Sequence, residues 1–134
     1  MSKPGFQGEQ MNVLVVGDDY EARQQLVDQL IAEDVDRVYE AANFEEALAV
    51  IRDADGIVCD APFPIRKGEP AFELAWIGMR AAARAFRRPF VLVTEDEDMK
   101  LEALHEDTDA YLKAEAPEAI GDLVHALKGE FAIA

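Results

Sequence analysis

Three short apolar runs constrain the fold of this chain more strongly than any other feature of its sequence. They cover residues 12–16, 56–60 and 90–93, and none of them alternates apolar with polar residues. Continuous runs of this kind are typical of central strands in a parallel sheet, because helices cover both faces of such a sheet. Two more polar segments, at residues 37–41 and 109–113, are typical of edge strands. The sequence therefore predicts five strands, three central and two at the edges.

Segments with helical spacing follow each of these five strands. They begin near residues 20, 44, 71, 97 and 116, and in the first of them Leu26, Val27, Leu30 and Ile31 share one side. Asn43 and Glu46 have the spacing of a capping box, and Pro70 suits the first turn of the third helix. Gly129 marks the expected end of the last helix.

The strict alternation of strands and helices predicts an α/β fold with a doubly wound, five-stranded parallel sheet. Placing the apolar strands in the middle and the polar strands at the edges gives the order 2-1-3-4-5, the order of flavodoxin-like folds. In this order a crevice opens between the first and third strands, at their carboxyl ends. Asp18 and Asp19 follow the first strand, Asp60 ends the third and Thr94 ends the fourth. We therefore expect these four side chains at one edge of the sheet.

Carboxylates gathered at one edge repel each other unless a cation joins them. Mg²⁺ typically takes one or two protein carboxylates, several waters and a phosphate oxygen. A carboxylate can also act as a nucleophile that accepts a phosphoryl group. Asp60 is the candidate acceptor, Asp18 the candidate metal ligand, and the Thr94 hydroxyl could hold a phosphoryl oxygen.

Composition excludes several other classes of protein. The formal net charge of −15 opposes binding to nucleic acid, and no apolar run is long enough to cross a membrane. The one cysteine, Cys59, lies inside an apolar run and suits a reducing cytoplasm. We expect residues 1–10 to form a flexible arm and residues 11–134 a single domain.

One segment departs from the acidic character of the chain. Residues 66–88 contain six basic and two acidic side chains. They form either a solvated helix face or a docking patch for an acidic partner.

Five pieces of the chain, in order and at matching spacings, resemble a response-regulator receiver domain over residues 12–128. They are Val-Leu-Val-Val-Gly-Asp-Asp with Arg23 after it, Ala-Ala-Asn-Phe-Glu-Glu-Ala-Leu, Gly-Ile-Val-Cys-Asp with Pro64 after it, Val-Leu-Val-Thr, and Asp-Ala-Tyr-Leu.

The resemblance implies a role for each matching residue. Asp60 would be the phosphoacceptor, Asp18 a ligand of Mg²⁺ and the backbone carbonyl of Pro62 a third ligand. Thr94 would be the switch hydroxyl and Tyr111 the aromatic side chain whose rotamer reports the state.

The resemblance also implies a cytoplasmic, stand-alone receiver in two-component phosphorelay signalling, with no fused output domain. Its partners would be a sensor histidine kinase or phosphotransfer protein and an unidentified downstream protein. The family allows a homodimer through the fourth helix, fifth strand and fifth helix. We expect a signalling phosphoacceptor rather than an enzyme, with at most self-phosphorylation and autodephosphorylation.

Two positions depart from the family pattern, so the receiver is partly degenerate. The family has two adjacent acids after the first strand, and here Gly17 and Asp18 occupy these positions. We expect Asp19 to lie outside the metal site, with an Asp18–Asp19 pair as the alternative. The family lysine falls at Ala114. Lys113 is one residue early, so we expect it on the other side of the strand as a surface lysine, with a role in the site as the alternative.

Three functions remain open from the sequence. The first is a receiver phosphorylated on Asp60 with Mg²⁺, which relays a signal through protein contacts. The second is a degenerate pseudo-receiver that acts as a phosphorylation-independent interaction module, which Gly17 and Ala114 favour. The third is a small enzyme such as a flavin carrier, although the chain has no glycine-rich phosphate loop.

Overall fold

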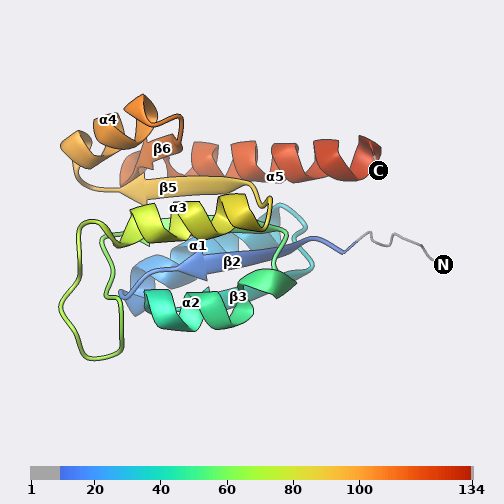
Figure 1. The fold of residues 1–134 in the computed structure, drawn as a ribbon. Helices are drawn as coiled ribbons and strands as arrows, with labels where there is room; N and C mark the ends of the chain where they lie inside the picture. The colour runs from blue at the N-terminus through green and yellow to red at the C-terminus, as the bar shows by residue number, and fades with distance from the viewer. Residues whose placement is uncertain (1–9, 134) are drawn as a thin grey trace.

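The computed structural model describes residues 10–133, with side chains up to residue 129. The arm expected at residues 1–10 lies, apart from Gln10, outside the described residues. The chain forms a five-stranded parallel sheet in the order β3-β2-β4-β5-β6 (Figure 1). Because the strands follow the chain in numerical order, this is the predicted order 2-1-3-4-5, which is confirmed. The strands are β2 (Asn12–Val16), β3 (Arg37–Ala41), β4 (Gly56–Ala61), β5 (Phe90–Thr94) and β6 (Asp109–Leu112).

The helices cover both faces of the sheet. Helices α1 (Tyr20–Ala32) and α5 (Ala116–Ile133) pack on one face, and α2 (Phe44–Val50), α3 (Ala75–Ala85) and α4 (Glu97–His105) pack on the other (Figure 1). Successive side chains of a strand point to opposite faces. Val13 and Val15 therefore pack with α1 and α5, whereas Leu14 and Val16 pack with α2 and α3. Both faces of the central strands are buried, which explains their uninterrupted apolar sequences.

Side-chain caps set the start of three helices. Asn43 accepts a hydrogen bond from the backbone N–H of Glu46 at 2.8 Å, and the Glu46 carboxylate accepts one from the N–H of Ala42 at 2.9 Å. The predicted capping pattern is therefore present, with the returning bond one residue earlier than the cap. Asp19 and Asp96 cap α1 and α4 in the same way.

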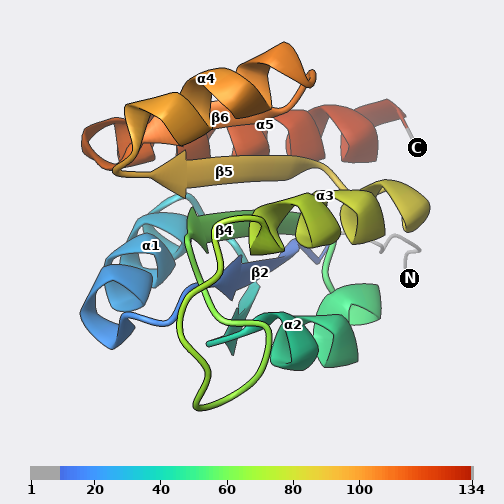
Figure 2. The same ribbon diagram turned by 60° about the vertical axis from the view of Figure 1, so that its left-hand side comes forward.

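The third helix begins later than predicted. Instead of starting at Pro70 or residue 71, α3 starts at Ala75, because residues 62–74 form a long loop (Figure 2). The buried side chain of Phe63 anchors the loop, and Phe63 and Phe72 form an antiparallel bridge that keeps the backbone at Phe72 extended. The Pro64 carbonyl accepts from the N–H of Phe44, so the loop also pairs a free donor at the start of α2.

Three further expectations are wrong: the end of β6, the end of α5 and the burial of Ile31 in α1. Strand β6 ends at Leu112, and Lys113 begins a short 3₁₀ helix, η2 (Lys113–Glu115). Helix α5 continues past Gly129 to Ile133. Ile31, expected on the buried side of α1, is 58% exposed. No helix between residues 10 and 133 has the length and apolar character needed to cross a lipid bilayer.

Candidate functional site

A cleft of about 290 Å³ opens at the carboxyl ends of the central strands. The loops after β2, β4, β5 and β6 all contribute to it, as expected for the crevice of a doubly wound sheet. The cleft brings together Asp18, Asp19, Asp60 and Thr94, the four side chains expected at this edge of the sheet. Pro62, named through the family resemblance, also lines it. The full lining is Asp18, Asp19, Asp60, Ala61, Pro62, Ala71, Thr94, Glu95, Asp96 and Lys113.

Asp60 lies in the wall of this cleft and is 5% exposed. Asp60 is the last residue but one of β4 and pairs with Val93 of β5. Burial raises the pKa of the Asp60 carboxyl, and the charges of Asp18 and Asp19 raise it further, while Lys113 opposes the rise. A buried carboxylate with a raised pKa at the edge of a cleft is typical of functional sites.

Lys113 is the cation that faces Asp60. Its Nζ lies 3.5 Å from Oδ2 of Asp60 and 3.3 Å from Oε1 of Glu95. The expectation that Lys113 points away as a surface lysine is wrong, because the strand ends at Leu112 and the 3₁₀ turn redirects the side chain. The alternation of sides applies only within a strand.

The ion pair affects its two members unequally. Burial works to lower the pKa of the Lys113 ammonium, but the charges of Asp60 and Glu95 outweigh it, so that pKa is raised. At Asp60, burial outweighs the ion pair, and the pKa is also raised. The pair therefore stabilises the charged form of Lys113. At Asp60 it offsets only part of the effect of burial, which favours the protonated carboxyl.

Thr94 is fully buried at the end of β5, opposite Ala61. Its Oγ1 accepts a hydrogen bond from the backbone N–H of Asp96 at 3.1 Å. This bond uses the hydroxyl as an acceptor, so its own proton can be donated to an oxygen in the cleft.

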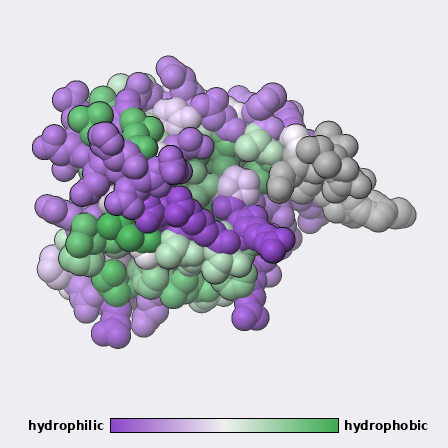
Figure 3. Space-filling view, turned by 45° about the horizontal axis from the view of Figure 1, so that its top comes forward, coloured by the Kyte–Doolittle hydropathy of each residue, from purple (hydrophilic) through white to green (hydrophobic). Residues whose placement is uncertain are grey.

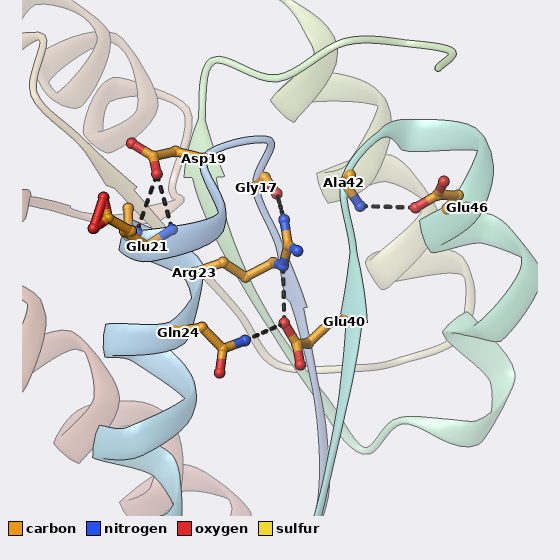
Figure 4. A network of polar contacts seen from close by, with 9 residues as sticks. Gly17, Asp19, Glu21, Arg23, Gln24, Glu40, Ala42 and Glu46 are labelled. Atoms are coloured by element: carbon orange, nitrogen blue, oxygen red, sulfur yellow. Dashed lines mark hydrogen bonds and ion pairs between the residues drawn. The ribbon is translucent and has the colours of Figure 1, made fainter. Parts of the chain in front are cut away.

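The two acids after β2 have different surroundings. Asp18 is exposed and lines the cleft. Asp19 also lines the cleft, but its Oδ1 accepts from the N–H groups of Glu21 at 3.0 Å and Ala22 at 3.3 Å (Figure 4). Asp19 is therefore the N-cap of α1, and this role accounts for an acid at that position.

The loop that carries Asp18 is tied down by Arg23. The Arg23 guanidinium donates to the Gly17 carbonyl at 2.6 Å and to Oε1 of Glu40 at 2.9 Å, and Gln24 donates to the same oxygen at 2.6 Å (Figure 4). From the sequence, Arg23 was predicted only as part of the receiver-like pattern, and Glu40 was not predicted. The available signal was the one acid in this polar edge strand.

Gly17 touches Asp60 closely. A Cβ at position 17 would lie 3.1 Å from the Cβ of Asp60 and 3.6 Å from its Oδ2. Any side chain at position 17 would therefore crowd Asp60, and the glycine allows the backbone to approach it closely.

Tyr111 lies outside the cleft. Its ring packs with the core between the sheet and α1 and α5, and its hydroxyl donates to Asp122 of α5. Burial and the neighbouring Asp122 raise the pKa of the Tyr111 hydroxyl. The structure thus fixes this ring through a bond to α5 that the sequence did not reveal.

The donors at the cleft fit a hydrated Mg²⁺ ion. Between residues 10 and 133 no three side chains of His, Cys, Asp and Glu are grouped closely enough to hold a metal. Mg²⁺ needs fewer protein ligands, since it keeps several waters. Asp18, Asp60 and a backbone carbonyl at Pro62 match that requirement, because all three residues line the same cleft.

Comparison with known proteins defines the class of the fold. No family model matches the sequence, and no curated protein matches it either. The structure is similar to the RcsB response regulator of Salmonella typhimurium, with a TM-score of 0.69, 20% identity and 90% of this chain covered. This chain spans 61% of the length of that protein.

Two further structures show what this similarity means. A CheY-like receiver domain from Methanospirillum hungatei has a TM-score of 0.66 at 20% identity, over 90% of this chain and 98% of the other. A designed Rossmann 2x3 protein has a TM-score of 0.65 at 12% identity, over 86% and 90%. At these identities the likeness concerns the fold alone, and the fold is that of response-regulator receiver domains.

Proposed function

We propose that this chain is a signalling receiver that accepts a phosphoryl group on Asp60. The observation that supports this most directly is the buried Asp60 carboxylate in the wall of an open cleft, with the Lys113 ammonium 3.5 Å away and the Thr94 hydroxyl in the same lining. A core aspartate with only a packing role would not face a cleft lined by a cation and a hydroxyl.

The transfer uses these groups in defined roles. An oxygen of Asp60 attacks the phosphorus of a phosphohistidine or a small phosphodonor; the new P–O bond forms as the bond to the leaving group breaks, and the leaving imidazole or carboxylate keeps the electron pair. The Lys113 ammonium then donates to a phosphoryl oxygen, and the Thr94 hydroxyl donates to another. Asp18, Asp60 and the Pro62 carbonyl would hold Mg²⁺, which neutralises charge on the transferring group when bound.

The signal would leave through protein contacts. A phosphoryl oxygen that accepts a hydrogen bond from the Thr94 hydroxyl changes the surroundings of the β5–α4 loop, since Thr94 also accepts a hydrogen bond from the N–H of Asp96. A sensor histidine kinase or a phosphotransfer protein would supply the phosphoryl group in the cytoplasm, and a downstream protein would read the surface of α4, β6 and α5. The hydrogen bond from Tyr111 to Asp122 lies on this surface.

A phosphorylation-independent interaction module is the second candidate. Gly17 supports it, because the family acid that helps to hold the metal is missing there. The absence of a lysine at position 114 supports it less, since the Lys113 ammonium reaches Asp60.

Intact-mass measurement after incubation with Mg²⁺ and acetyl phosphate separates these candidates. We expect the mass of one phosphoryl group on the parent protein and on Asp28→Asn, a control at an exposed position of α1. We expect none on Asp60→Asn. An adduct that persists in Asp60→Asn, or no adduct on the parent with either acetyl phosphate or phosphoramidate, would refute phosphorylation at Asp60.

A further inference from the structure

A second depression lies between the segment that enters α3 and helix α4. It has a volume of about 140 Å³ and shares only Asp96 with the Asp60 cleft. We call it the α3–α4 groove. Its lining consists of Glu73, Leu74, Asp96, Asp98, Met99 and Glu102.

A large, half-exposed apolar side chain lines this groove. Leu74 is 48% exposed, and Phe72, two residues earlier in the chain, is 47% exposed. Figure 3 shows two areas of hydrophobic surface on its left-hand side, separated by a hydrophilic band. Side chains of this size contribute binding energy when a partner covers them.

The rim of the groove is strongly negative. Its four carboxylates come from Glu73, Asp96, Asp98 and Glu102. Within the described residues no lysine or arginine forms an ion pair with Glu73, Asp98 or Glu102, whereas the carboxylates of Glu95, Glu106 and Glu115 are paired.

We propose that the α3–α4 groove binds a basic, amphipathic segment of a partner protein. An apolar side chain of the partner packs on Leu74 and Met99, and flanking lysine or arginine side chains meet the carboxylates of the rim. Charge complementarity selects this occupant, because an acidic peptide or a nucleic acid would be repelled. The inference requires no phosphorylation of Asp60 and goes beyond the proposed function.

Three basic residues of the segment 66–88 bind within their own chain and are less available to a second copy. Arg80 and Arg84 of α3 donate to Glu106, and Arg88, which follows α3, donates to the carbonyl of Arg52. For the segment as a whole, a solvated helix face and a docking patch for an acidic partner both stay predictions.

The test measures binding of a fluorescein-labelled helical peptide of lysine, leucine and alanine to the parent protein and to three variants. Each variant replaces an uncharged leucine with an uncharged serine. Leu74→Ser alters the lining of the groove, whereas Leu101→Ser and Leu104→Ser change side chains of α4 that do not line it. Leu104→Ser is the matched control, since it lies four residues after Lys100, whose ion pair with Glu115 marks the other side of α4. None of these changes alters the net charge, so nonspecific attraction of a basic peptide stays constant.

We expect Leu74→Ser to weaken binding about tenfold, because it removes a large apolar contact from the centre of the groove. Leu101→Ser and Leu104→Ser should each change the affinity by less than about twofold. A second peptide with serine in place of leucine should bind weakly to every form.

Equal affinities for Leu74→Ser and Leu104→Ser would overturn the inference, and so would equal binding of the serine peptide. Amide chemical shifts of the ¹⁵N-labelled parent provide a readout that needs no variant. Changes on peptide addition at residues 73–74 and 96–102 support the groove, and changes confined to other surfaces refute it.

Discussion

The ion pair between Lys113 and Asp60 can be tested by a double-mutant cycle of Lys113→Met and Asp60→Asn. At 3.5 Å the attraction of two unit charges is about 5 kcal/mol for an effective dielectric constant of about 20. The Lys113 side chain is 34% exposed, so solvent screens the pair and we expect a coupling free energy of about 2 kcal/mol.

The pH dependence has a defined sign. The pKa of the Asp60 carboxyl is raised above its ordinary value of 3.8. The protonated carboxyl therefore favours the folded state, and this contribution is fully present below pH 3.8 and lost as the pH rises through the raised pKa. Lys113→Met raises that pKa further, because it removes the opposing cation. The loss of stability in Lys113→Met should therefore be largest near neutral pH and shrink on acidification.

Urea unfolding of the four proteins at neutral and acidic pH measures the cycle. Glu95→Gln serves as a control, since the Glu95 side chain is 80% exposed and contributes little to stability. Single effects that add within about 0.5 kcal/mol at neutral pH would show that the two side chains do not interact. That result would remove Lys113 from the proposed site.

Three further changes probe the loop beside Asp60. Gly17→Asp should destabilise the protein by about 1–3 kcal/mol, because its Cβ lies 3.1 Å from that of Asp60; Mg²⁺ should raise its melting temperature more than that of the parent, and an equal rise would contradict the metal assignment. Arg23→Met should cost about 1–3 kcal/mol in urea unfolding through the lost bonds to Gly17 and Glu40, and Glu40→Gln should reproduce part of it. Asp19→Ala should cost about 1 kcal/mol as a lost helix cap, whereas Asp19→Asn, which can still cap, should cost much less; equal losses would argue against the capping role.

The order of the strands in the sheet could be predicted because strands buried on both faces have continuous apolar sequences. Strands β2, β4 and β5 are buried on both faces, so they contain no alternation, whereas β3 and β6 keep polar residues at the edges. The order of the strands then places Asp18, Asp60 and Thr94 at one edge, because parallel strands end on the same side. The proximity of these three residues could therefore be predicted from the sequence alone.

Positions that depend on contacts between distant segments could not be predicted. Pro70 is a favourable first residue for a helix, but the pairing of Phe63 with Phe72 holds the chain extended there and delays α3. Gly129 is a common end for a helix, yet α5 continues to Ile133. Local preferences of this size are easily outweighed by tertiary packing.

The sequence by itself determined the class of fold and the edge at which the polar residues gather, since both follow from apolar patterning along the chain. Only the tertiary structure decided that Lys113 faces Asp60, that Arg23 ties the Gly17 carbonyl to Glu40, and that Leu74 and α4 enclose a second groove. The reason is physical: patterning fixes which face of an element is buried, whereas these contacts depend on where a strand ends and a turn begins. A shift of one residue at Leu112 changes the direction of the next side chain, and the sequence pattern does not locate such ends to within one residue.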